Sequence, residues 1–205
     1  MTPLTPRFFS QPIHRVARDL LGRELVRPLD DDRRRARIVE VEVYEGTHDR
    51  ASHASSGEAT ARTRPMFASP ATIYVYQIYG RYQCLNIRAT DDATPGAILI
   101  RAAEPLTAHA AMAVDRGFAE TPELYDNGRL YDLMSGPAKL CQALRIDTSL
   151  SGRPLGEELW VEAGRPVDEA AIESTPRIGL NRETCGSATD FLWRYVIADS
   201  PWASR

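Results

Sequence analysis

The segment from residue 37 to residue 53 constrains the fold of this chain more than any other. In its first half, small apolar residues alternate with larger or charged ones at a period of two. This period is typical of a β-strand whose two faces meet different surroundings. We therefore predict a strand with one core-facing side and one side directed elsewhere. The core-facing side is expected to carry Val39, Val41 and Val43, and the other side Ile38, Glu40, Glu42 and Tyr44.

The two carboxylates of this strand have two possible explanations. Successive residues on one face put Glu40 and Glu42 about 7 Å apart, either on a solvated sheet face or along the wall of a site. The residues that follow favour a site. Glu45 and Gly46 end the strand, and a short polar segment then carries His48 and His53. A carboxylate, a tyrosine and a histidine are thus expected at one strand exit.

The length and composition limit what the chain can be. With 205 residues, it is expected to form a single domain over residues 1–205. No apolar run reaches the ~20 residues of a membrane-spanning helix, and no signal pattern begins the chain, so we expect a soluble, cytoplasmic protein. Three widely separated cysteines argue against a disulfide framework or a thiolate zinc site. The net charge of −3 does not itself indicate a nucleic-acid partner, although a basic face remains possible on such a chain.

The first third of the chain contains a helix and a strand pair. Ser10 is expected to cap a helix that begins near Ile13 and ends before Gly22, with His14 on its surface. A short strand over residues 24–27 is expected to pair with the central strand. The charged residues 30–35 between them read as a solvated hairpin tip.

Residues 73–87 predict a β-hairpin, because aromatic and β-branched residues flank a turn at Gly80. The tyrosines of this hairpin have two possible explanations: they pack against each other across the strands, or they form a surface that contacts stacked bases. Tyr79 lies beside the turn, where a ring has little core to contact and is well placed to insert between bases. The polar loop before the hairpin carries Arg62 and Arg64, which suit either a solvated loop or phosphate contacts.

The rest of the chain supplies further strands and helices. We expect a strand over 97–101, a helix from Glu104 to about Arg116, and a helix capped by residues 135–137. Residues 147–176 show one clear strand, at 159–161, and a closing strand spans 191–197, with the ordered core ending at Trp202. The predicted fold class is α+β: a curved, largely antiparallel sheet with packed helices and a protruding β-hairpin.

Several motifs, in order, point to a known family. They are residues 37–44, 66–67, 74–80, 85–87, 100–105 and 135–144. In these motifs the chain resembles the alkyladenine (3-methyladenine) DNA glycosylase family, the type without a helix-hairpin-helix motif. The resemblance covers nearly the whole chain, from residue 8 to residue 202.

This resemblance implies a DNA-repair enzyme that flips a damaged purine out of duplex DNA and hydrolyses its glycosidic bond without a cofactor or a metal. Its substrate is expected among 3-methyladenine, 7-methylguanine, hypoxanthine and ethenoadenine, its partner is double-stranded DNA, and it is expected to act as a monomer, nucleoid-associated if bacterial. The implied roles are: Glu42 as the base that activates water; Tyr44, His53 and Tyr76 as pocket walls; Asn86 as the filter against guanine; Tyr79 as the intercalating residue; and Arg101 as a DNA contact. Arg62, Arg64 and Arg81 are the further arginines expected at DNA.

The chain departs from this family pattern in two places. Residues 197–199 read Ile-Ala-Asp where relatives often have an arginine and a glycine, and Arg81 stands where relatives often have an apolar residue. Since Lys139 is the only lysine and is expected in a helix, strand cleavage through a lysine Schiff base is not expected. Two other functions fit the residues: a metal-dependent hydrolase using Glu40, Glu42, His48 and His53, or a non-catalytic module that binds nucleic acid through the tyrosine hairpin.

Overall fold

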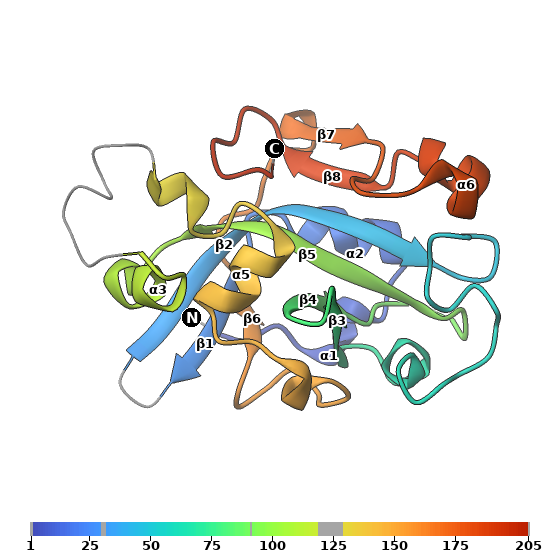
Figure 1. Cartoon of the computed structure of the whole chain (residues 1–205), viewed down its shortest axis with the longest axis horizontal. Coiled ribbons are helices and arrows are strands. Elements are labelled where there is room, and N and C mark those ends of the chain that lie inside the picture. The colour runs from blue at the N-terminus through green and yellow to red at the C-terminus, as the bar shows by residue number, and fades with distance from the viewer. Residues whose placement is uncertain (1, 30–31, 91, 119–128, 205) are drawn as a thin grey trace.

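The two long strands β2 (Asp32–Glu45) and β5 (Gly96–Pro105) run antiparallel through the middle of the molecule (Figure 1). The computed structural model describes residues 2–29, 32–90, 92–118 and 129–204. In this part of the chain the sheet has eight strands, in the order β3-β4-β5-β2-β1-β6, while β8 pairs with β2 and β7 pairs with β8. The remaining strands are β1 (Glu24–Leu29), β3 (Ile73–Ile78), β4 (Tyr82–Ile87), β6 (Trp160–Glu162), β7 (Ile172–Thr175) and β8 (Arg194–Ile197). The predicted α+β class with a largely antiparallel sheet is confirmed.

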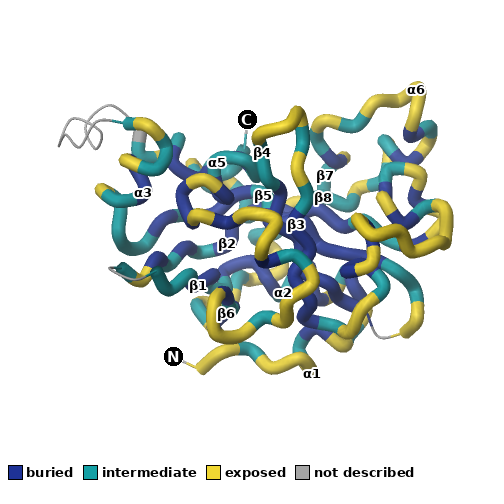
Figure 2. The backbone as a smooth tube through the Cα atoms, turned by 60° about the horizontal axis from the view of Figure 1, so that its bottom comes forward, coloured by how far each residue is buried: buried dark blue, intermediate teal, exposed yellow. Residues whose placement is uncertain are grey.

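Short helices cover this sheet. The α-helices are α1 (Pro6–Phe9), α2 (Ile13–Leu20), α3 (His109–Asp115), α5 (Pro137–Ala143) and α6 (Arg182–Cys185). The 3₁₀ turns are Arg64–Phe67, Arg129–Asp132, Thr148–Leu150, Glu169–Ala171 and Gly186–Asp190. Helix α2 packs against β2 and β5, and α5 packs against β4 and β5. Figure 2 shows the result as buried backbone along β2, β3 and β5. None of the described helices is long and apolar enough to cross a membrane.

Strand β2 changes its pairing partner midway. Its first half pairs with β1 as far as Arg37, and Glu40 to Glu42 pair with β8 on the same edge. Between these two parts the register with β5 shifts around Glu40, which marks a β-bulge. The bulge lies where β2 changes partner, between the half that pairs with β1 and the half that carries the carboxylates and pairs with β8.

The bulge also corrects the predicted faces of this strand. Ile38 packs in the main apolar cluster with Val41 and Val43, whereas Val39 is buried but belongs to neither apolar cluster. One extra residue in a strand swaps the side on which every earlier side chain lies. Ile38 was therefore assigned to the wrong face, while the shared face of Glu40 and Glu42 was correct.

Several predicted details in the first third of the chain were wrong. Ser10 follows α1 and bonds back to the Pro6 carbonyl, while Pro12 occupies the start of α2 without a side-chain cap. His14 is half-buried, with its Nδ1 2.8 Å from the Tyr195 hydroxyl. The predicted hairpin tip is strand from Asp32 onward, and Arg34 is buried against Asp115 because paired charge can enter the interior. Residues 30 and 31 lie outside the described part.

The later elements also differ from their predicted bounds. Strand β5 continues through Glu104 to Pro105, so the next helix, α3, starts only at His109. Pairing along β2 explains the longer strand, since Glu104 lies opposite Arg37. Strand β7 was not expected; its side chains do not alternate clearly, and it forms because β8 offers it an edge. The chain beyond Trp202 also remains part of the fold, because Ser204 bonds to Glu40.

The predicted hairpin is present as β3 and β4, joined by a turn of three residues, Tyr79, Gly80 and Arg81. The first two have positive φ, 50° for Tyr79 and 69° for Gly80, a combination that twists the turn in the sense favoured by hairpins. Gly80 tolerates this conformation, but a tyrosine in it is uncommon. The Tyr79 side chain is 88% exposed, so no packing in the molecule explains why an aromatic residue stands there.

Candidate active site

A cavity of about 500 Å³ opens where β2, β3, β4 and β5 meet the segment after β7. This volume lies within the range of small-ligand sites in proteins. The predicted residues that line it are Tyr44, His53, Tyr76, Tyr79, Asn86 and Arg101. They come from separate parts of the chain, and the fold brings them around one space.

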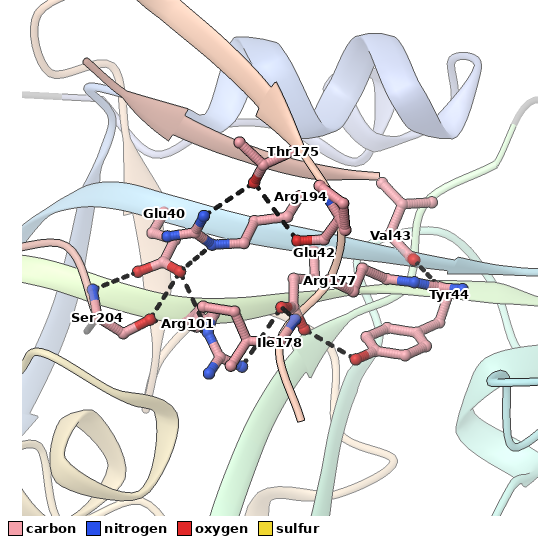
Figure 3. A network of polar contacts seen from close by, with 11 residues as sticks. Glu40, Glu42, Val43, Tyr44, Arg101, Thr175, Arg177, Ile178, Arg194 and Ser204 are labelled. Carbon is pink, nitrogen blue, oxygen red and sulfur yellow. Dashed lines mark hydrogen bonds and ion pairs between the residues drawn. The ribbon is translucent and has the colours of Figure 1, made fainter. Parts of the chain in front are cut away.

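Glu42 is fully buried and does not itself line the cavity, but it lies directly behind residues that do. Its Oε2 accepts a hydrogen bond from the Tyr44 hydroxyl at 2.8 Å, and its Oε1 accepts one from the backbone N–H of Ile178 at 2.8 Å. The Arg101 Nη1 lies 3.4 Å from the same Oε1 (Figure 3). All three partners line the cavity. The carboxylate is thus held in a fixed orientation by donors that themselves face the cavity.

Glu40 lies two residues earlier and has a different environment. It is also fully buried, but its oxygens accept hydrogen bonds from Arg194 Nε at 2.5 Å and from the backbone N–H and the hydroxyl of Ser204 at 2.6 and 2.7 Å. Arg101 Nε lies 3.1 Å away. Glu40 therefore neutralises two half-buried arginines, and of its partners only Arg101 lines the cavity; like Glu42, Glu40 itself does not.

Tyrosine and histidine rings form the walls. Burial, followed by the charge of Glu42, raises the pKa of Tyr44 well above its usual value, so its hydroxyl stays protonated and donates to Glu42. Burial also raises the pKa of Tyr76. The rings of His53 and Tyr76 meet edge-on, with centroids 4.6 Å apart. These walls present flat apolar surfaces of the kind that hold a planar aromatic ligand.

His53 is neutral at physiological pH. Partial burial of its ring, followed by the charge of the nearby Arg62, lowers the pKa of His53 to about 4, although much of the residue is exposed. Its Nδ1 lies 2.9 Å from the Tyr74 hydroxyl, and its Nε2 lies 3.4 Å from Arg62 Nη2. Because a guanidinium only donates, Nε2 is the acceptor and Nδ1 carries the proton. His53 therefore adds no positive charge to the cavity.

Asn86 is fixed at the cavity by two backbone groups. Its amide nitrogen donates to the carbonyl oxygens of Tyr74 and Cys84, both at 3.2 Å. Since both acceptors require the NH₂ side of the amide, the orientation of the group is determined by its partners. A side chain held in this way cannot rotate out of the path of a ligand.

A buried ion pair supports the wall opposite the hairpin. Arg177 donates to Asp49 through two nitrogens, at 2.6 and 2.7 Å, and to the carbonyl of Val43 at 2.8 Å. Its guanidinium also lies 4.7 Å from the Tyr44 ring centre. These contacts fasten the segment that follows Arg177 to β2, and that segment supplies the N–H that binds Glu42.

The predicted arginines do not all gather at the cavity. Arg101 lines it, whereas Arg62 does not but contacts a lining residue, with its guanidinium 5.3 Å from the Tyr76 ring centre. Arg81 stacks on the Tyr82 ring at 4.6 Å beside the exposed Tyr79. Arg64 is exposed at the start of a 3₁₀ turn and does not reach the cavity.

The four side chains of the metal-hydrolase alternative lie apart. Glu40 is paired with arginines, His48 lies against the Trp193 ring at 5.7 Å, and His53 faces Tyr74. Within the described ranges, no cluster of three or more histidine, cysteine, aspartate or glutamate side chains is arranged to hold a metal ion. The geometry thus gives this alternative no support.

Sequence reasoning missed several members of the site. Ile178 contributes only a backbone N–H, which no side-chain pattern marks. Cys84, one of the three lone cysteines, is buried and also lines the cavity. Ser204 and Arg194 reach Glu40 from the end of the chain. The Arg-Ile-Gly-Leu run at 177–180, unusual in a loop otherwise rich in polar residues, was the one available signal for that wall.

Comparison with known proteins defines the class as a DNA glycosylase. A family model described as "Methylpurine-DNA glycosylase (MPG)" matches residues 7–201. The chain belongs to the methylpurine-DNA glycosylase family, and the prediction of a DNA glycosylase is confirmed at that level.

Individual relatives agree over the full length of the chain. A protein of Alkaliphilus oremlandii named "Putative 3-methyladenine DNA glycosylase" is 40% identical, over 98% of this chain and 98% of its own. A protein of Methanocella arvoryzae with the same name is 42% identical, over 99% of this chain and 96% of its own. The "DNA-3-methyladenine glycosylase" of Mus musculus is 40% identical over 98% of this chain and 61% of the mouse protein.

Proposed function

We propose that the protein removes damaged purines, of the 3-methyladenine, 7-methylguanine, hypoxanthine or ethenoadenine class, from double-stranded DNA. A base inside a duplex is out of reach, so the nucleotide is flipped into the cavity at a cost of a few kcal/mol. The observation that carries this proposal is the position of Glu42: a buried carboxylate directly behind an aromatic cavity, with each of its partners facing that cavity.

The walls hold the flipped base. Tyr44 and Tyr76 offer their faces to a purine, and a purine alkylated on a ring nitrogen carries a positive charge that such faces attract, by up to ~2 kcal/mol when water is excluded. Asn86, with its amide held by two carbonyls, opposes the exocyclic amine of normal guanine. Tyr79, exposed at the hairpin turn, fills the space that the base leaves in the duplex.

Glu42 performs the chemistry with water. As the glycosidic bond breaks, the sugar develops oxocarbenium character, which a nearby carboxylate stabilises while it takes a proton from the attacking water. The electron pair of the broken bond leaves with the purine, and water oxygen bonds to the sugar carbon. Tyr44 and the Ile178 N–H fix the carboxylate during this step, and Arg101 supplies a cation beside it for the flipped nucleotide.

The reaction is proposed to stop at the abasic site. Strand cleavage by glycosylases usually needs an amine that forms a Schiff base. The single lysine, Lys139, pairs with Asp132 and lies 3.4 Å from the Ser135 hydroxyl, and it does not line the cavity. An enzyme acting as a monomer on duplex DNA is sufficient for this chemistry.

Release of a free base tests the function. The protein is incubated, with and without chelator, with duplexes that each carry one of the four lesions, and the released base is identified by mass spectrometry. We expect a free damaged base, an otherwise intact strand, and no effect of the chelator. Binding of the duplex with no base released would support the nucleic-acid-binding alternative, and trapping of Lys139 on DNA by borohydride would contradict the single-step reaction.

A further inference from the structure

The end of the chain makes direct contact with the polar network behind the cavity. After β8 the backbone turns at Asp199, where φ is 55°, and the Ser200 N–H bonds to the Ile197 carbonyl. The Trp202 ring then packs against Tyr131 with centroids 4.7 Å apart. These contacts return the tail to β2 and place Ser204 beside Glu40 (Figure 3).

Ser204 links the two charged groups of the network. Its hydroxyl donates to Glu40 Oε1 at 2.7 Å and accepts a hydrogen bond from Arg101 Nε at 2.9 Å. Its backbone N–H occupies the other oxygen of Glu40 at 2.6 Å. The Ser204 hydroxyl thus acts as a donor and as an acceptor at the same time. Of its two partners, Glu40 is fully buried and Arg101 is 12% exposed.

The bridge determines how Arg101 is oriented. A guanidinium is a planar group with donors in a fixed fork, so fixing Nε fixes the direction of both terminal nitrogens. Nε is held by Ser204 and Glu40, and as a result Nη1 is directed at Glu42 Oε1, 3.4 Å away. Arg101 also lines the cavity. The orientation of its charge at the site therefore depends on a residue that lies outside the site.

We infer that Ser204 is a positioning residue for base excision: through its hydroxyl bridge between Glu40 and Arg101, it holds the Arg101 guanidinium against Glu42 and the cavity. This inference rests on the proposed function of Glu42. It assigns the Ser204 hydroxyl a part in the chemical step, beyond a packing role for the tail.

Three variants of the full chain test the bridge. Ser204→Ala removes the hydroxyl, Ser204→Thr keeps it, and Ser200→Ala is the matched control, because it removes a hydroxyl from the same tail that has no partner among the described residues. Single-turnover excision and duplex binding are measured for each on the lesion that the parent releases fastest. We expect Ser204→Ala to lower the single-turnover rate about 10- to 100-fold, since small misplacements of site groups cost up to this much, with the dissociation constant changed less than about 3-fold. Ser204→Thr and Ser200→Ala should match the parent.

A second measurement follows Arg101 directly. The ¹⁵Nε–¹H signal of Arg101, assigned by its loss in Arg101→Lys, should be resolved and slow to exchange in the parent and in Ser204→Thr. It should broaden or exchange rapidly in Ser204→Ala. This readout does not depend on DNA or on activity, and a purely structural role of the tail predicts equal changes at many other backbone signals.

The outcomes separate this inference from the function that it rests on. A parental rate in Ser204→Ala, or an unchanged Arg101 signal, overturns the positioning role, and so does a combined loss of binding and rate that threonine fails to restore. In each of these cases Glu42→Gln still loses excision. If Glu42→Gln excises as fast as the parent, the proposed function itself fails, whatever Ser204 does.

Discussion

Glu40 and Glu42 lie on one face of one strand, both are fully buried, and their partners are nevertheless of different kinds. Glu40 neutralises Arg101 and Arg194 and is further bound by Ser204, so each of its oxygens is already held by strong donors. Glu42 is held mainly by neutral donors, a tyrosine hydroxyl and a backbone N–H, that line the cavity. Burial alone does not mark a reactive carboxylate. The two carboxylates differ in their partners. Those of Glu42 all line the cavity, whereas Glu40 mainly balances the charge of two arginines, of which only Arg101 lines it.

The strongest test of this comparison removes the charge from Glu42. Glu42→Gln keeps the size of the side chain but cannot take a proton from water, so excision should fall about 10²- to 10⁴-fold. Binding of the damaged duplex should stay near that of the parent, because the aromatic walls and Tyr79 are unchanged. Single-turnover excision and equilibrium binding measure the two effects. A rate within 10-fold of the parent contradicts the role assigned to Glu42.

The same change at Glu40 should act on the fold first. Glu40→Gln removes the buried carboxylate that two half-buried arginines share, and breaking an ion pair of this kind costs about 3 kcal/mol. The ion pairs therefore predict a markedly less stable protein. Urea denaturation of Glu40→Gln and the parent measures the difference in their free energy of unfolding. A parental free energy of unfolding for Glu40→Gln shows that the arginines find other partners.

A change at the hairpin tip separates base extrusion from chemistry and leaves both carboxylates in place. Tyr79→Ala removes a ring that is 88% exposed, so it should barely change stability. Excision from a fully paired duplex should slow about 10-fold or more, as stacking of one ring on bases contributes roughly 1–3 kcal/mol. Mismatched and single-stranded substrates serve as the internal control, on which the loss should be smallest. Equal losses on all substrates would indicate damage to the hairpin itself.

A change at Asn86 tests how the cavity next to Glu42 discriminates damaged purines from normal guanine. Asn86→Ser shortens the amide that two backbone carbonyls hold at the cavity. Release of undamaged guanine should rise about 10-fold above background, the size of discrimination that one steric or polar contact provides. Long incubation with undamaged duplex, followed by mass spectrometry of free bases, measures it. No increase would place the filter on another residue of the wall.

The effect that bears least on excision concerns pH and the His53 wall. The pKa of His53 falls to about 4 in the folded protein from a usual value near 6.5, so the unfolded chain binds more protons between these values. The free energy of unfolding should therefore fall as the pH drops from 6.5 towards 4. His53→Gln should flatten this part of the curve. An unchanged slope in the variant would assign the acid sensitivity to other groups.

The outline of the fold was readable from local patterns, and the site was readable only in part. Alternation predicted the strand that carries Glu42, and the aromatic run predicted the hairpin. The β-bulge near Glu40 was missed: an inserted residue shifts the two-residue period by one, and the only mark of the shift is the adjacent apolar pair Ile38 and Val39, which a strand buried on both faces would also show. Ser204 lies 164 positions from Glu40, and Ile178 acts through its backbone, so neither contact follows from local sequence.

The backbone at Tyr79 has a consequence for how the protein balances durability against use. A tyrosine at a φ of 50° costs roughly 1 kcal/mol or more of folding free energy, and at 88% exposure its ring recovers little of that by packing. A glycine or an asparagine there would give a more robust molecule. An aromatic ring at this strained, exposed position is what a trade-off between stability and activity predicts. Its benefit appears only when a partner is bound.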